Sequence, residues 1–128
     1  MKKWILVFIL AFGFNLIWEE LHKFLYIHYQ GKEISQLVLI KAAFVDGVII
    51  LGLILLIHLI NLSKKPWLIV IFGIIISVLI EKWALVTGRW EYNNLMPIIP
   101  VLKVGLTPII QLGLLGYLIH RLIFKEKA

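Results

Sequence analysis

Apolar residues along this chain occur in four long runs, separated by shorter stretches that are rich in polar residues. Each run reaches roughly 20 residues, the length that an α-helix needs to cross the ~30 Å hydrocarbon core of a bilayer. The pattern therefore predicts four membrane helices, at about residues 4–25, 37–62, 67–88 and 104–124. Two separators read as turns, whereas the third, residues 89–103, contains two prolines and is expected to be a shaped loop.

Composition places the chain in the membrane class. Hydrophobic residues make up 62% of it, whereas a soluble domain contains about 45–50% apolar residues. We expect one all-α integral membrane domain over residues 1–128, a four-transmembrane-helix bundle. The basic start and the apolar run that follows resemble a signal peptide, but no small-residue cleavage site follows, so an uncleaved first helix is expected. The absence of cysteine excludes disulfides and cysteine catalysis.

Lysine and arginine indicate the orientation of the helices. Seven of these residues fall at the N-terminus, in the second turn and at the C-terminus, which is one side of the predicted topology. They are Lys2, Lys3, Lys64, Lys65, Arg121, Lys125 and Lys127. Six fall on the other side or in the helix ends that approach it, so the bias is small in number, but the seven have only Glu126 as a nearby acid. We expect both termini to be cytoplasmic, in a multi-pass protein of the cell membrane.

Each predicted helix carries one polar side chain at a similar depth in its outer half. At ~1.5 Å per residue, Glu19 lies roughly 22 Å along its helix from the inner boundary, and Glu81 lies roughly 21 Å along its own. Asp46 and Gln111 reach a comparable depth when measured from the outer boundary. Ionisable groups inside a membrane are costly and are usually functional, so these four positions indicate a polar site within the bilayer.

Helical spacing places further side chains beside these four. Asn15, Glu19, His22 and Tyr26 follow each other at i, i+4, i+7 and i+11, which is one stripe of a helix. Thr107 lies one turn from Gln111 on the last helix. Small residues surround Glu81 on its own helix and predict close helix packing. That stripe consists of Gly73, Ser77, Glu81, Ala84 and Gly88.

Structural explanations compete with a site. Glu19 and Glu20 would be unremarkable if the first helix ended before them. Asp46 would be structural if it paired with Lys41 or bound a neighbouring helix. Glu81 in turn could pair with Lys82 or Arg89 at the surface. Metal binding is not expected, because the i, i+3 pair of Glu19 with His22 has no second pair to complete a ligand set.

The residues point to acid/base chemistry. Several carboxyl groups around one buried cavity favour keeping one of them protonated, and that group is a candidate general acid. A histidine beside a carboxylate is a candidate base. The predicted catalytic residues are Glu19, His22, Asp46 and Glu81. The predicted ligand-binding residues are Asn15, Tyr26, Arg89, Trp90, Tyr92, Thr107 and Gln111, with Arg89 and Lys103 as candidates for holding a phosphate at the mouth.

Three resemblances accompany this interpretation. The segment TGRWEYNNLMPIIPVLKVGLTPIIQ (87–111) resembles the pattern of lycopene cyclase-type membrane domains, in which acids after the proline protonate a polyene. Ile109 and Ile110 follow Pro108 here, so the resemblance implies no catalytic residue. The segments FNLIWEELHKFLY and GRWEYNNLMPIIP resemble short prokaryotic four-helix membrane proteins, which implies the architecture and no activity. The arrangement also resembles VanZ-like lipid-processing proteins at the level of the fold alone.

Three functions remain open on this evidence. The first is the binding or modification of a membrane lipid or isoprenoid. The second is a small proton-coupled transporter that uses Glu19, and the third is a non-catalytic subunit that assembles with itself or with a partner membrane protein. The net charge of +6 is spread over helix ends without a basic stripe, so a nucleic-acid partner is not expected. No cofactor is expected.

Overall fold

The computed structural model describes residues 2–124, and within them four helices are long and apolar enough to cross a membrane. They are α1 (Lys2–His22), α2 (Gln36–Leu59), α3 (Trp67–Val86) and α4 (Leu106–Ile123). A short 3-10 turn, η1 (Lys23–Leu25), follows α1. These helices confirm the prediction of a mostly helical membrane bundle. Lys125, Glu126 and Lys127, which entered the charge comparison, lie outside the described residues.

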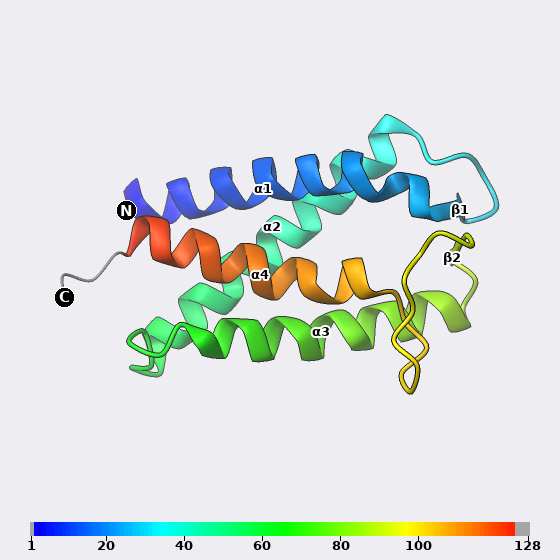
Figure 1. The fold of residues 1–128 in the computed structure, drawn as a ribbon. Helices are drawn as coiled ribbons and strands as arrows, with labels where there is room; N and C mark the ends of the chain where they lie inside the picture. Colours follow the sequence, from blue (N-terminus) through cyan, green and yellow to red (C-terminus); the bar gives the residue numbers. More distant parts are fainter. Residues whose placement is uncertain (1, 125–128) are drawn as a thin grey trace.

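A small sheet joins two loops at one end of the bundle (Figure 1). Strand β1 (Tyr26–Tyr29) pairs antiparallel with β2 (Trp90–Tyr92). The prediction that Tyr26 continues the helical stripe of α1 was therefore wrong, because α1 ends at His22 and Tyr26 begins a strand. Both segments are rich in aromatic residues, which favour strands. Their partners lie more than sixty positions away in the sequence, so no local pattern signals the pairing.

The helices form two closely packed pairs, α1 with α2 and α3 with α4. The contact of α3 with α4 depends on glycine, because a Cβ atom added to Gly73 would lie 2.5 Å from the backbone nitrogen of Gly113. Small residues permit this close approach of two helix backbones. The predicted small-residue stripe ends earlier than expected, since Gly88 lies beyond α3 with a φ of +73°.

Helix α2 runs obliquely across the bundle (Figure 1). It lies near α1 at the end that carries the sheet, and it reaches α3 at the opposite end, where residues 60–66 connect the two helices. Helices α2 and α3 therefore diverge toward the sheet. Apolar side chains fill the bundle where they converge. This core includes Val7, Ile50, Ile54, Ile57, Ile69, Leu115 and Ile119.

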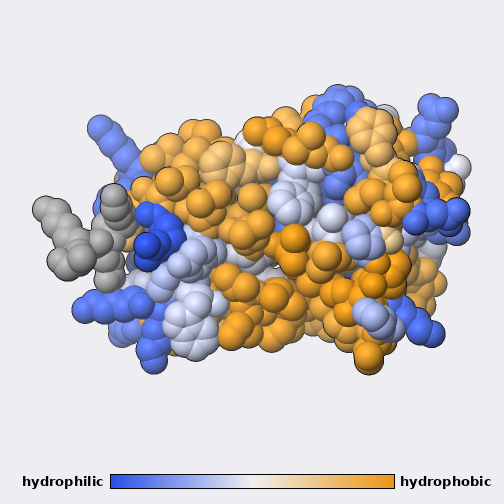
Figure 2. All heavy atoms as spheres, in the orientation of Figure 1, coloured by the Kyte–Doolittle hydropathy of each residue, from blue (hydrophilic) through white to orange (hydrophobic). Residues whose placement is uncertain are grey.

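The surface of the molecule is apolar between two polar ends (Figure 2). Large apolar side chains are strongly exposed along the helices, for example Ile9 at 58%, Leu79 at 65% and Val86 at 83%. An exposed apolar belt of this extent is expected for a surface that faces lipid. This surface, together with four helices of membrane-spanning length, is that of a multi-pass membrane protein.

Candidate functional site

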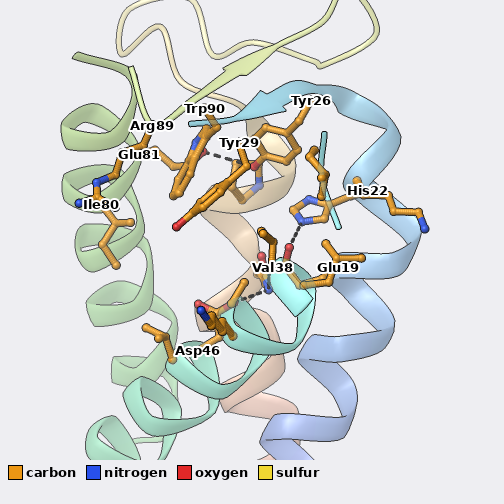
Figure 3. A pocket seen from close by; sticks show the side chains of 18 of the residues that line it. Glu19, His22, Tyr26, Tyr29, Val38, Asp46, Ile80, Glu81, Arg89 and Trp90 are labelled. Atoms are coloured by element: carbon orange, nitrogen blue, oxygen red, sulfur yellow. Dashed lines mark hydrogen bonds and ion pairs between the residues drawn. The ribbon is translucent and has the colours of Figure 1, made fainter. Parts of the chain in front are cut away.

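A cavity of about 430 Å³ lies where α2 and α3 diverge, beside the small sheet. All four helices and both strands contribute to its wall, and Figure 3 shows the side chains that project toward it. Glu19 and His22 come from α1, Asp46 from α2, Glu81 from α3 and Gln111 from α4. The cavity therefore collects polar groups that are far apart in the sequence.

The Gln111 side chain connects three helices at the deep end of the site. Its Nε2 atom lies 2.8 Å from Asn15 Oδ1, 3.0 Å from Asp46 Oδ2 and 3.1 Å from Glu19 Oε1. A side-chain amide has only two N–H donors, so the three acceptors share them. Because both carboxyl groups lie within hydrogen-bond distance of one nitrogen, Asp46 and Glu19 must lie close together.

Glu19 and His22 form a pair one turn apart on α1. The His22 Nε2 atom lies 3.0 Å from Glu19 Oε2, and the other ring nitrogen lies 3.4 Å from Thr107 Oγ1. When Nε2 carries the proton and donates a hydrogen bond to Glu19, Nδ1 is the basic nitrogen of the ring. Both side chains line the cavity. This pair has the geometry of an acid/base couple.

Glu81 accepts hydrogen bonds from three ring systems. The Tyr92 hydroxyl donates to Glu81 Oε1 over 2.5 Å, the Trp90 indole over 3.4 Å and the Tyr26 hydroxyl over 3.5 Å. Burial raises the pKa of both tyrosines above the ordinary value, and the nearby Glu81 charge raises it further. Both phenols therefore remain neutral donors, which fix the Glu81 carboxyl against the sheet.

Aromatic rings and cationic side chains line the outer part of the cavity. The rings of Tyr29 and Trp90 are stacked, with centroids 6.2 Å apart and an angle of 22° between their planes (Figure 3). The Arg89 guanidinium lies over the Trp83 ring, 4.5 Å from its centroid. Lys41 also lines the cavity, from α2. The polar end of the site thus carries positive charge, while its interior carries acids.

The structure brings the eleven predicted catalytic and ligand-binding residues to one region. Eight of them line the cavity, namely Glu19, His22, Tyr26, Asp46, Glu81, Arg89, Trp90 and Gln111. Asn15, Tyr92 and Thr107 do not line it but contact residues that do. The position of these residues does not test the roles predicted for them, which remain predictions.

Some cavity residues were missed by the sequence analysis. Ser77 lines the cavity one turn before Glu81, and its place on the small-residue stripe was the available signal. Tyr29 reaches the cavity only because β1 pairs with β2, which no local pattern indicates. Lys103 was expected at the mouth, but the described cavity wall does not include it, and Lys41 is present instead. Lys103 is exposed on the proline-containing loop.

The structural explanations for the acids are met only in part, since Asp46 does contact a neighbouring helix through Gln111 of α4. Helix α1 continues through Glu19 and ends at His22, so the acid is not at a frayed end. Among residues 2–124, the ion pairs are His22 with Glu19, Lys23 with Glu20, and His28 with Glu91. The expected alternative pairings of Asp46 and of Glu81 with basic neighbours are not among them.

Comparisons with known proteins leave the site to be interpreted from its own geometry. No protein-family model, curated protein or solved structure matches this chain. Within residues 2–124, no group of three or more histidine, cysteine, aspartate or glutamate side chains is arranged to hold a metal ion. The carboxyl, imidazole, phenol and amide groups gathered here can support proton transfer, hydrogen bonding and charge pairing.

Proposed function

We propose that this membrane protein binds the polar end of a lipid or isoprenoid and modifies it by acid/base chemistry. One observation carries the proposal: ionisable side chains from three helices converge on a cavity inside an apolar bundle, and Gln111 of the fourth helix joins those of α1 and α2. A charged side chain at the centre of a bilayer costs about 2.5–3.5 kcal/mol on insertion scales. Several such groups around one cavity are more consistent with a functional site than with structural residues.

Access from the lipid supports a membrane substrate. Val45 of α2 and Trp83 of α3 line the cavity, and they are 53% and 51% exposed. The cavity wall therefore reaches the outer face of the bundle between these two helices. A molecule whose polar end enters there keeps its apolar chain in the bilayer, which is a simpler route than full extraction into water.

The proposed roles follow from the contacts. His22 acts as the base and Glu19 orients its ring and exchanges a proton with it across the 3.0 Å contact. Asp46, held by Gln111, is the second acid of the deep end. Glu81, held by the sheet, presents a carboxyl group from the opposite wall.

We also propose that both termini are cytoplasmic, in the cell membrane, so that the sheet and the cavity face outward. The excess of basic residues near the termini and the 60–66 turn supports this orientation. Because the chain has no cysteine, single cysteines at Gln36 and Ser63 offer a direct test. A membrane-impermeant maleimide should label Gln36→Cys and spare Ser63→Cys in intact cells, and the reverse pattern would show the opposite orientation.

Proton-coupled transport is a second candidate, favoured by the linked protonatable groups Glu19, His22 and Asp46. A transporter needs a path to the other side of the membrane, and the apolar core around Ile50, Ile54 and Ile57 blocks that path in this conformation. Proton flux into proteoliposomes that depends on Glu19 and on an added solute would support this candidate over the first.

The test of the main proposal compares lipid extracts by mass spectrometry. Cells making the wild type are compared with cells making Glu19→Gln or Glu20→Gln at equal membrane levels. Glu20 is the matched control, because it is the neighbouring acid, contacts Lys23 and Gln36, and does not line the cavity. A lipid or isoprenoid species that changes with the wild type and Glu20→Gln, but not with Glu19→Gln, is expected. Identical extracts in a host that contains the native lipids would contradict the proposal.

A further inference from the structure

Three acidic side chains line the cavity, and most of them form no ion pair among residues 2–124. Glu19, Asp46 and Glu81 all line it, and His22 is the only basic partner that forms an ion pair with any of them in residues 2–124. Buried carboxylates are strongly disfavoured unless a positive charge and hydrogen bonds compensate them. A ligand that brings a positive charge into the cavity would supply this compensation.

Ser77 indicates that the ligand also brings hydrogen-bond donors. It is 3% exposed and lines the cavity, and its Oγ atom has no hydrogen-bond partner within the part of the chain that the structure describes. Buried hydroxyl groups nearly always have a partner. Glu81 lies one turn further along the same face of α3, and its three protein donors all reach Oε1 rather than Oε2. Two acceptors on α3 are thus suited to a group with several N–H bonds.

The aromatic wall is suited to a cation as well. Tyr26, Tyr29 and Trp90 line the cavity, with the Tyr29 and Trp90 rings stacked on each other. The face of an aromatic ring attracts a cation within about 6 Å of its centroid. A quaternary ammonium would use the rings but has no N–H bond for Ser77 and Glu81, whereas a primary ammonium satisfies both.

The mouth of the cavity has the opposite charge. Lys41 and Arg89 line the cavity at its polar end, and neither forms an ion pair with a carboxylate among residues 2–124. Arginine and lysine at such a position suit a phosphate. The site therefore has an acidic interior and a basic rim, which is the complement of a zwitterion with a terminal ammonium and a phosphate behind it.

We infer that the cavity recognises an aminophospholipid, with its primary ammonium among Ser77, Glu81 and Asp46 and its phosphate at Arg89 and Lys41. The lipid enters from the outer leaflet between α2 and α3, where the two helices diverge (Figure 1) and where Val45 and Trp83 of the cavity wall are exposed. This inference rests on the proposed lipid-binding function and names the class of head group.

Binding to the purified protein in detergent tests the inference without requiring turnover. Native mass spectrometry would compare three short-chain phospholipids with identical acyl chains and ethanolamine, choline or glycerol head groups. The ethanolamine lipid is expected to bind about tenfold more tightly than the choline lipid, because only a primary ammonium makes the charge-assisted hydrogen bonds. Ser77→Ala and Glu81→Gln should each remove most of that preference, whereas Glu20→Gln should preserve it.

The rim is tested separately. Arg89→Gln should weaken the binding of the ethanolamine lipid and of the choline lipid by a similar factor, because both lipids carry the phosphate. Circular dichroism and thermal unfolding establish that each variant is folded. Ser77→Ala removes a single heavy atom and is the variant expected to disturb folding least. Equal binding of all three lipids, or tightest binding of the glycerol lipid, would overturn the inference.

The two proposals fail in different ways. If the ethanolamine lipid binds selectively but cellular lipids do not depend on Glu19, then recognition of the ammonium holds and the acid/base function is rejected. If lipid composition depends on Glu19 but the purified protein shows no preference for a primary amine, then the acid/base function holds and the inference about the head group is rejected.

Discussion

The two ends of this bundle both gather histidines and aromatic rings, but they differ in what surrounds those rings. At the end opposite the sheet, His58 lies between Trp4 and Phe124, with ring centroids 5.2 Å and 4.5 Å away. Its Nδ1 atom lies 2.9 Å from the Ile54 carbonyl oxygen of its own helix. At the sheet end, His22 faces a carboxylate and lines a cavity. The same side chain therefore serves packing at one end and is available for proton transfer at the other.

The two halves of the bundle also differ in how closely their helices pack. Toward the termini, the apolar core fills the space between the helices, and Gly73 and Gly113 bring α3 and α4 into backbone contact. Toward the sheet, α2 and α3 separate and polar side chains line the space. We interpret the tightly packed half as the part that stabilises the bundle, so that the other half can maintain a cavity containing costly polar groups.

Replacing one histidine at each end of the bundle should give the largest difference in activity between two variants. His22→Gln is expected to lower activity on the lipid identified in cell extracts by about 100-fold or more, because it removes the group assigned to general base catalysis. His58→Gln should leave activity within roughly twofold of the wild type, since His58 is remote from the cavity. Turnover of that lipid by purified protein measures both.

The outcome that matters is the contrast between these variants. Equal loss of activity in His22→Gln and His58→Gln would mean that both act through the fold, and the assignment of His22 would be wrong. Equal thermal stability of the two variants would confirm that the comparison reports chemistry.

The tightly packed half should be most sensitive to added volume. Gly73→Ala is expected to destabilise the protein by about 1–3 kcal/mol, because the new Cβ would collide with the α4 backbone, which has little freedom to move. Gly52→Ala is the matched control on α2, where a Cβ meets no heavy atom within 4 Å. Thermal unfolding in detergent should show a clear decrease for the first variant and none for the second. A neutral Gly73→Ala would refute the close contact of the two helices.

The cavity half should depend on the single amide that links its helices. Gln111→Leu keeps a similar volume but removes the donor shared by Asn15, Glu19 and Asp46. Leaving buried acceptors without a donor should cost about 1–2 kcal/mol, and activity should fall because Glu19 loses a contact that positions it. Unfolding measurements and turnover test this together. Unchanged stability would indicate that water satisfies these acceptors without Gln111.

The smallest effect concerns alkaline pH at the sheet. The pKa values of Tyr26 and Tyr92 are raised in the folded protein, whereas an unfolded tyrosine titrates near pH 10. Below about pH 10 the two tyrosines are protonated in both the folded and the unfolded state, so their titration does not change the stability with pH. Above it the unfolded chain loses protons first, so stability should decrease as pH rises. The double variant Tyr26→Phe, Tyr92→Phe should lose part of this dependence in thermal unfolding measured across that range, and an unchanged slope would contradict the prediction.

The sequence predicted the parts of the site that depend on position along one helix. The four spans follow from the length and composition of the apolar runs, and the structure places their ends within a few residues of the prediction. The shared depth of Glu19, Asp46, Glu81 and Gln111 follows from the rise of a helix. These properties depend only on position along the sequence, because in a regular helix that position determines the height of each residue along the helix axis.

Other features depend on how distant segments meet, and only the tertiary structure decided them. The pairing of β1 with β2 ended α1 earlier than the helical spacing suggested, and it brought Tyr29 onto Trp90. The oblique course of α2 opened the cavity beside α3, and it put Lys41 rather than Lys103 on the cavity wall. Nothing local encodes these outcomes, because strand pairing and helix crossing arise from contacts between residues far apart in the chain. The sequence by itself thus determined which polar groups lie on the apolar helices and how far along each helix they lie. Tertiary packing decided which of them line one cavity.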